Sequence, residues 1–287
     1  MVCAQEAARE ISPETTFRTD TRLVVLNVSV FDNEGKIVKG LPKSAFTVYE
    51  NGEKQEIKVF RQEDVPVSLG LIIDNSASMR DKRERVASAA VKLIQASNPE
   101  DEVFIMKFNE RQVLAKDFTS DLKELERSLR DLDATGETAM RDALRLGIEH
   151  LKDAGKKDKK VLLVVTDGED NSSVETLQHV VQAAHQNDVL IYAIGLLGAE
   201  EPRSAERARR ALEQLTTATG GRVWFPNDVA EVEKITPEIA HEIRNQYVLA
   251  YSPANPAASG GFRKIGVDVN VPGVTVRTRS GYYAGSR

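Results

Sequence analysis

The 287-residue chain has a single cysteine, Cys3, so neither an intrachain disulfide nor a cysteine-based metal site can form. No stretch approaches the ~20 consecutive apolar residues that a membrane-spanning helix requires. Basic residues are not in excess either: the net charge is -5 and the isoelectric point is near 5.6. Nucleic-acid binding depends on clustered lysines and arginines, so we expect no nucleic-acid partner.

Sequence patterns of common enzymes are missing as well. The chain has no G-x-x-x-x-G-K-[ST] phosphate loop and no G-x-S-x-G nucleophile turn. Its histidines all lie in helical patterns and form neither an H-E-x-x-H motif nor a triad-like group; they are His150, His179, His185 and His241. We therefore predict no catalytic residues and a protein that is not an enzyme.

The composition, 41% hydrophobic and 29% charged residues, is typical of a globular protein with a sizeable core. Residues 1–16 are polar and lack periodicity, so we expect them to be disordered. Residues 17–64 carry only strand patterns, including Asn51-Gly52 between two apolar runs, which predicts a hairpin. Strand patterns without helices return after Asn245.

Between these flanks, strand patterns alternate with helical patterns, which indicates βαβ units. We predict an α/β fold with a doubly wound, mostly parallel sheet over residues 65–245 and one antiparallel edge strand at 111–119. Neither flank alone has enough strands for a core, so segments 17–64 and 246–284 are expected to pair as one discontinuous β-sandwich. The helical pattern 229–246 contains Pro237, which predicts a kink or a break there.

Polar side chains gather where strands of this predicted sheet end. The stretch LGLIIDNSASMRDK places Asp74, Ser76 and Ser78 directly after a buried strand. Thr138 precedes a helix in DATGETAMRDAL, and Asp167 follows another buried strand in LLVVTDGED. In an open parallel sheet, ligands bind outside the carboxyl ends of the strands, so the three loops should meet at one edge.

The donors that these loops offer are all oxygen atoms of carboxylates and hydroxyls. Such hard donors suit Mg²⁺, with Mn²⁺ or Ca²⁺ as alternatives, and disfavour zinc. Each serine alone could equally be a helix N-cap, and Asp167 alone could be a turn residue. Their joint placement favours the metal site.

D-x-S-x-S, the threonine before a helix and the T-D-G after a strand together resemble the metal-ion-dependent adhesion site of von Willebrand factor type A domains. The resemblance covers about residues 66–245, and the flanks resemble those of bacterial, acidobacterial-type members of this family. It implies that Ser76, Ser78 and Thr138 are direct metal ligands and that Asp74 and Asp167 act directly or through water. The integrin β motif D-x-S-x-S-M-x-D-D is similar too, but Lys82 stands where its second aspartate is expected, which puts an adjacent calcium site in doubt.

By this resemblance the protein is a divalent-cation-dependent adhesion or scaffold module, and its open metal position takes an Asp or Glu of a protein partner. Two alternatives remain open. The same oxygen cluster could serve a metal-assisted hydrolase, or the site could be degenerate in a structural envelope protein. We expect an exported protein whose signal segment is absent from this sequence, with a cytoplasmic location as the alternative.

Overall fold

The computed structural model describes residues 23–62, 64–130, 134–199, 201–253 and 261–285. The segment predicted to be disordered, 1–16, lies outside these ranges. The α-helices of the described part are α1 (Arg83–Ala96), α2 (Leu122–Arg130), α3 (Met140–Ala154), α4 (Leu177–Gln186), α5 (Pro202–Thr219) and α6 (Val232–Arg244). None of the described helices is long and apolar enough to cross a membrane.

A six-stranded sheet forms the centre of the α/β unit, in the order β10-β9-β8-β5-β6-β7. Its strands run parallel except β7, which pairs antiparallel with β6 at the edge. The predicted fold class and edge strand are therefore confirmed. The strands are β5 (Val67–Asp74), β6 (Glu102–Phe108), β7 (Gln112–Thr119), β8 (Lys159–Thr166), β9 (Val189–Gly195) and β10 (Val223–Trp224).

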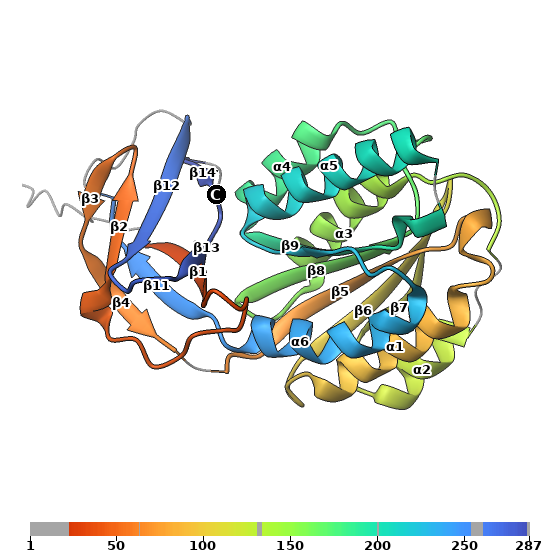
Figure 1. Ribbon diagram of the computed structural model, residues 1–287, viewed down its shortest axis with the longest axis horizontal. Helices are drawn as coiled ribbons and strands as arrows, with labels where there is room; N and C mark the ends of the chain where they lie inside the picture. Colours follow the sequence, from red (N-terminus) through yellow and green to blue (C-terminus); the bar gives the residue numbers. More distant parts are fainter. Residues whose placement is uncertain (1–22, 63, 131–133, 200, 254–260, 286–287) are drawn as a thin grey trace, which may run out of the picture.

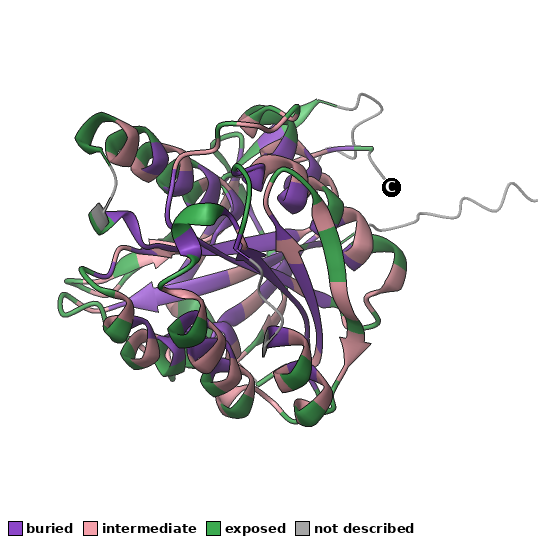
Figure 2. Ribbon diagram, turned by 90° about the vertical axis from the view of Figure 1, so that its right-hand side faces the viewer, coloured by how far each residue is buried: buried purple, intermediate pink, exposed green. Residues whose placement is uncertain are grey.

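Both faces of this sheet are covered by helices, with α1, α2 and α6 on one face and α3, α4 and α5 on the other (Figure 1). Side chains alternate along β5, so Leu69, Leu71 and Ile73 enter one core and Ile72 enters the other. A strand buried on both faces needs apolar residues at every position, which explains the uninterrupted run in the sequence. Figure 2 shows the buried strands passing through the middle of the molecule.

The segments before and after the α/β unit pair with each other in two antiparallel sheets, ordered β13-β1-β11-β4 and β14-β12-β2-β3. Each sheet contains strands from both ends of the chain, as β1 pairs with β11 and β2 with β12. The strands are β1 (Val24–Phe31), β2 (Phe46–Glu50), β3 (Glu53–Gln55), β4 (Ile57–Arg61), β11 (Tyr247–Tyr251), β12 (Phe262–Val269), β13 (Thr275–Arg277) and β14 (Gly281–Tyr283).

Apolar side chains from both four-stranded sheets share one buried cluster, which includes Leu26, Val48, Leu249 and Ile265. The Asn51-Gly52 hairpin between β2 and β3 is confirmed, and both of its turn residues have positive φ. These pairings support a division into a discontinuous unit, 17–64 with 246–284, and an inserted unit, 65–245. We propose this division for the chain.

Helix α6 links the α/β unit to strand β11 and is held at its C-terminal end by contacts of charged side chains. The Lys159 ammonium donates to the Ile243 carbonyl, and Arg244 donates to the Ala96 carbonyl at 3.0 Å and pairs with Asp64. The break predicted at Pro237 is wrong, because α6 runs through this residue. Proline cannot donate to the carbonyl of Glu233, and the Thr236 hydroxyl bonds to that oxygen instead at 3.3 Å.

The buried carboxyl of Glu242 on α6 makes the stability of the fold depend on pH. Burial raises its pKa to about 7, although Arg222, with a nitrogen 3.6 Å away, opposes the shift. Folding therefore takes up a proton between the ordinary pKa of glutamate and pH 7, and the contribution of this group to stability falls as pH rises through that range.

We expect Glu242→Gln to remove the pH-dependent contribution of this carboxyl to stability. The free energy of unfolding of the variant relative to wild type should rise by up to about 3 kcal/mol between pH 4.5 and pH 7. Urea unfolding of both proteins at several pH values measures the difference and cancels the groups that they share. A difference that stays constant with pH would show that Glu242 is ionised in the folded protein throughout.

Candidate metal centre

Three loops meet at the end of the α/β unit that lies away from the four-stranded sheets (Figure 1). Strands β5 and β8 are parallel neighbours, with Ile73 opposite Val165, so Asp74 and Asp167 leave the sheet side by side. The third loop carries Thr138 into α3. The sequence predicted this convergence, and hydrogen bonds join the three loops.

Asp74 is the buried anchor of the first loop, with 1% of its surface exposed. One carboxylate oxygen accepts the Ser76 amide at 2.9 Å, and the other accepts the Thr166 hydroxyl at 2.6 Å. Burial raises its pKa to about 6, hydrogen bonds from Ser76 and Thr166 oppose the shift, and the charge of Asp167 adds to it. A bound cation would favour the ionised form of this group.

The two serine hydroxyls and Asp167 form one continuous hydrogen-bonded cluster. The hydroxyl oxygens of Ser76 and Ser78 lie 3.1 Å apart, and Ser78 donates to a carboxylate oxygen of Asp167 at 2.7 Å. Ser76 and Asp167 are buried, whereas Ser78 and its neighbour Ala77 are exposed. The cluster therefore opens to solvent on the side of Ser78.

The loop of Thr138 is tied to both other loops through backbone atoms. The amide of Ala77 donates to the Gly136 carbonyl at 3.2 Å. The Thr138 carbonyl accepts the amide of Asn171 at 3.0 Å, and the Thr138 amide donates to the side chain of Asn171 at 2.9 Å. Thr138 is buried at this junction, but its hydroxyl makes no hydrogen bond to the serines or aspartates within the described residues.

Lys82 is the residue of this site that sequence reasoning missed. Its ammonium pairs with the carboxylate oxygen of Asp167 that does not accept from Ser78. The Asp167 side chain is fully buried, whereas that of Lys82 is 21% exposed. A signal existed in the sequence, since Lys82 follows Ser78 by four residues in a segment that turns into a helix, where side chains four apart are neighbours.

Two other acidic residues, both in the loop after β8, are paired with arginines. Glu169 pairs with Arg207, and Asp170 pairs with Arg141 at 2.9 Å. In the described part of the chain, no three His, Cys, Asp or Glu side chains gather as a metal-binding group. The predicted ligands therefore include only two carboxylates and are otherwise hydroxyls.

These residues fit a divalent cation. The donors are all oxygen, the two serines and Asp167 already touch, and a cationic group already lies against Asp167. A doubly wound α/β unit with such a loop cluster outside its strand ends defines a class of ligand-binding α/β domain. The family model for the von Willebrand factor type A domain matches residues 69–169, which confirms the resemblance of this part of the chain to that domain.

Solved structures share the fold at low identity. A von Willebrand factor type A protein from Catenulispora acidiphila is 15% identical with a TM-score of 0.55, over 93% of this chain and 74% of that one. The corresponding domain of the type V pili tip protein Mfa5 from Porphyromonas gingivalis is 12% identical with a TM-score of 0.52, over 63% and 95% of the two chains.

A third similar structure is proximal thread matrix protein 1 from the mussel byssus, which is 16% identical with a TM-score of 0.53. The match covers 64% of this chain and 48% of the mussel protein, so it spans about half the length of that relative. Another structure of the mussel protein has a zinc-occupied metal-ion-dependent adhesion site. No match was found among the curated proteins.

Proposed function

We propose that this protein is a divalent-cation-dependent protein-binding module that works in adhesion or as a scaffold outside the cytoplasm. The observation that carries the proposal is the cluster of Ser76, Ser78 and Asp167, which hydrogen bonds of 3.1 and 2.7 Å join and which opens to solvent at Ser78. The similar pilus-tip and byssus structures support such a role.

In the proposed site, Ser76, Ser78 and Thr138 hold the cation directly, and Asp74 and Asp167 hold it directly or through water. Mg²⁺ suits this donor set, and Mn²⁺ or Ca²⁺ could replace it. When bound, the ion supplies a positive charge that neutral hydroxyls cancel poorly. An Asp or Glu side chain of a partner protein would therefore be attracted to the open position near Ser78.

Calorimetric titration with Mg²⁺ tests the metal site. The double variant Ser76→Ala, Ser78→Ala removes two neutral ligands, and we expect its affinity for Mg²⁺ to fall by at least about 100-fold. Ser172→Ala is the matched control, because Ser172 lies at the same sheet edge and its hydroxyl makes no hydrogen bond within the described residues. Equal affinities in wild type and the double variant would refute the ligand assignment.

A peptide array tests the carboxylate partner. We expect peptides containing Asp or Glu to bind in Mg²⁺ and to be released by a chelator, whereas the same peptides with Asn or Gln should not bind. Peptide binding that persists without the metal, or equal binding of the Asp and Asn peptides, would contradict the proposed recognition of an acidic residue.

A further inference from the structure

The contact between Lys82 and Asp167 places an ammonium group of this chain in the proposed metal centre. The backbone of Lys82 is fixed, since its amide donates to the Met79 carbonyl at 2.9 Å and its carbonyl accepts the Val86 amide at 3.0 Å. Its side chain crosses from the start of α1 to the loop after β8 and reaches the buried carboxylate. The contact joins two of the three loops that form the site.

Two other cations near this edge of the sheet pair with carboxylates that are not predicted ligands. Arg141 pairs with Asp170, and Arg207 pairs with Glu169. Arg80 is exposed and lies two residues before Lys82. Among the ion pairs of the described residues, the pair with Lys82 is the one that includes a predicted metal ligand.

A dication and this ammonium would compete for the same negative charge. Asp167 has one oxygen bonded to Ser78 and the other paired with Lys82, so its charge is already compensated before a metal binds. A cation held beside the serines would repel the ammonium, and this repulsion is strong in a poorly solvated site. Lys82 has a flexible side chain that is 21% exposed, so it can move its ammonium into water.

We propose that Lys82 is an internal counter-ion that competes with the divalent cation for Asp167. The site then has two states, one in which the ammonium neutralises Asp167 and one in which the metal displaces it. The lysine lowers the affinity for the metal, so that the site fills only where divalent cations are abundant. This inference rests on the proposed function, because it requires that the serines and Asp167 hold a cation.

Mg²⁺ titration of the full chain, followed by calorimetry and by thermal unfolding, tests this role. We expect Lys82→Gln to bind Mg²⁺ about tenfold more tightly than wild type, because metal binding no longer has to break an ion pair. Arg80→Gln removes an exposed charge from the same turn and should change the affinity by less than about threefold, since exposed charges are screened.

Thermal unfolding supplies a second readout. Without metal, Lys82→Gln leaves Asp167 buried and without its cation, so its melting temperature should be lower than that of wild type. Saturating Mg²⁺ should then raise the melting temperature of Lys82→Gln more than that of wild type. Lys82→Arg keeps the positive charge and should retain a Mg²⁺ affinity close to that of wild type. This variant also tests the role of the charge if Lys82→Gln folds poorly.

The outcomes separate this inference from the proposed function. If wild type binds Mg²⁺ and Lys82→Gln binds it equally or more weakly, the competition is refuted and the metal site stands. If neither protein binds, both proposals fail and a degenerate site in a structural protein is favoured. Binding by Lys82→Gln alone would support the inference in its strongest form. An equal gain of Mg²⁺ affinity in Arg80→Gln would refute the competition, because the gain would then come from the change in net charge.

Discussion

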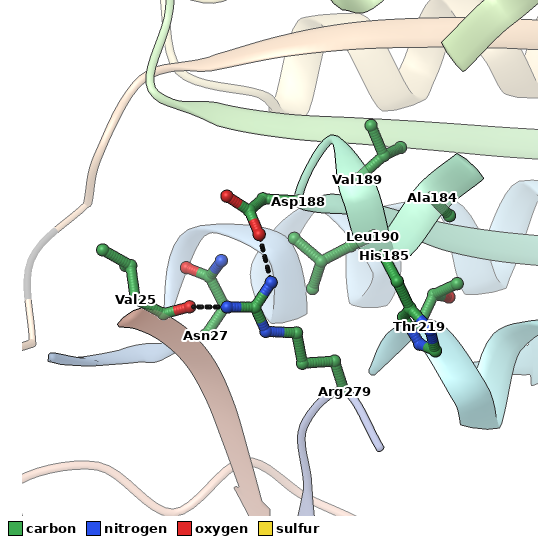
Figure 3. Close-up of a pocket in the computed structure, with 9 residues that line it drawn as sticks. All are labelled: Val25, Asn27, Ala184, His185, Asp188, Val189, Leu190, Thr219 and Arg279. Carbon is green, nitrogen blue, oxygen red and sulfur yellow. Dashed lines mark hydrogen bonds and ion pairs between the residues drawn. The ribbon is translucent and has the colours of Figure 1, made fainter. Parts of the chain in front are cut away.

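Replacing Arg279 by methionine is expected to lower the free energy of unfolding by about 2 to 3 kcal/mol, since it removes a buried guanidinium and leaves its hydrogen-bond and ion-pair partners behind. Arg279 lies just after β13 and extends toward the α/β unit (Figure 3). Its guanidinium pairs with Asp188 in the turn between α4 and β9 and donates to the Val25 carbonyl of β1 at 2.9 Å. One side chain thus joins both proposed units.

The surroundings of Arg279 explain why this loss should be large. Burial lowers its pKa to about 10, and its side chain is only 10% exposed, against 31% for Asp188. The next residue continues the contact, because the Ser280 amide donates to the Ala218 carbonyl of α5 at 2.9 Å. Without the guanidinium, the carbonyl of Val25 and the Asp188 carboxylate lose a charged partner at the junction.

Urea unfolding of Arg279→Met and of the matched control Arg210→Met measures this effect. Arg210 forms an i,i+4 pair with Glu206 on α5, and its side chain is 74% exposed, so we expect its loss to change stability by less than about 0.5 kcal/mol. Arg279→Met should also separate the unfolding of the two units into distinct transitions. Equal effects of both substitutions would mean that the junction does not depend on Arg279.

Much of the fold could be predicted because its signals are local. Strands of the six-stranded sheet such as β5 are buried at every position because helices cover both faces, and this produces long, mostly apolar runs in the sequence. The exposed pattern of β7 and the Asn51-Gly52 turn are equally local. The order of the loops along the chain then placed Asp74, Thr138 and Asp167 at one edge by the general rule for parallel sheets.

The contacts that the sequence did not reveal join residues far apart in the chain. Lys82 and Asp167 are 85 residues apart, and Arg279 and Asp188 are 91 apart. Such pairs depend on how the loops and the two units pack together. The spacing of apolar residues along the sequence does not indicate that packing. The continuity of α6 through Pro237 has a different reason, because the Thr236 hydroxyl bonds to the carbonyl that proline leaves free. This hydrogen bond requires a specific rotamer of Thr236, which the sequence does not indicate. The sequence therefore predicts only the usual effect of proline, a break or a kink.

Asp74→Asn is expected to weaken Mg²⁺ binding by about 10- to 100-fold, because it removes one of the two carboxylate charges of the predicted ligand set. Asp74 accepts the Ser76 amide at 2.9 Å and the Thr166 hydroxyl at 2.6 Å, so it shapes the loop that presents both serines. An asparagine has the same shape and can keep both contacts, with its oxygen accepting from Ser76 and its amide group donating to Thr166. The change therefore removes the charge of Asp74 from the site and leaves the loop in place.

Asp170→Asn is the control for this experiment, because it removes an equal charge from the loop that carries Asp167. Asp170 pairs with Arg141 and accepts from Ser173 at 2.8 Å, so its charge is already compensated. We expect its loss to change the Mg²⁺ affinity by less than about threefold, since a compensated charge contributes little to the potential at the site. Calorimetry on both variants decides between two origins of cation affinity. If Asp170→Asn weakened binding as much as Asp74→Asn, the affinity would come from the overall negative potential of this edge, and Asp74 would have no specific part in holding the cation.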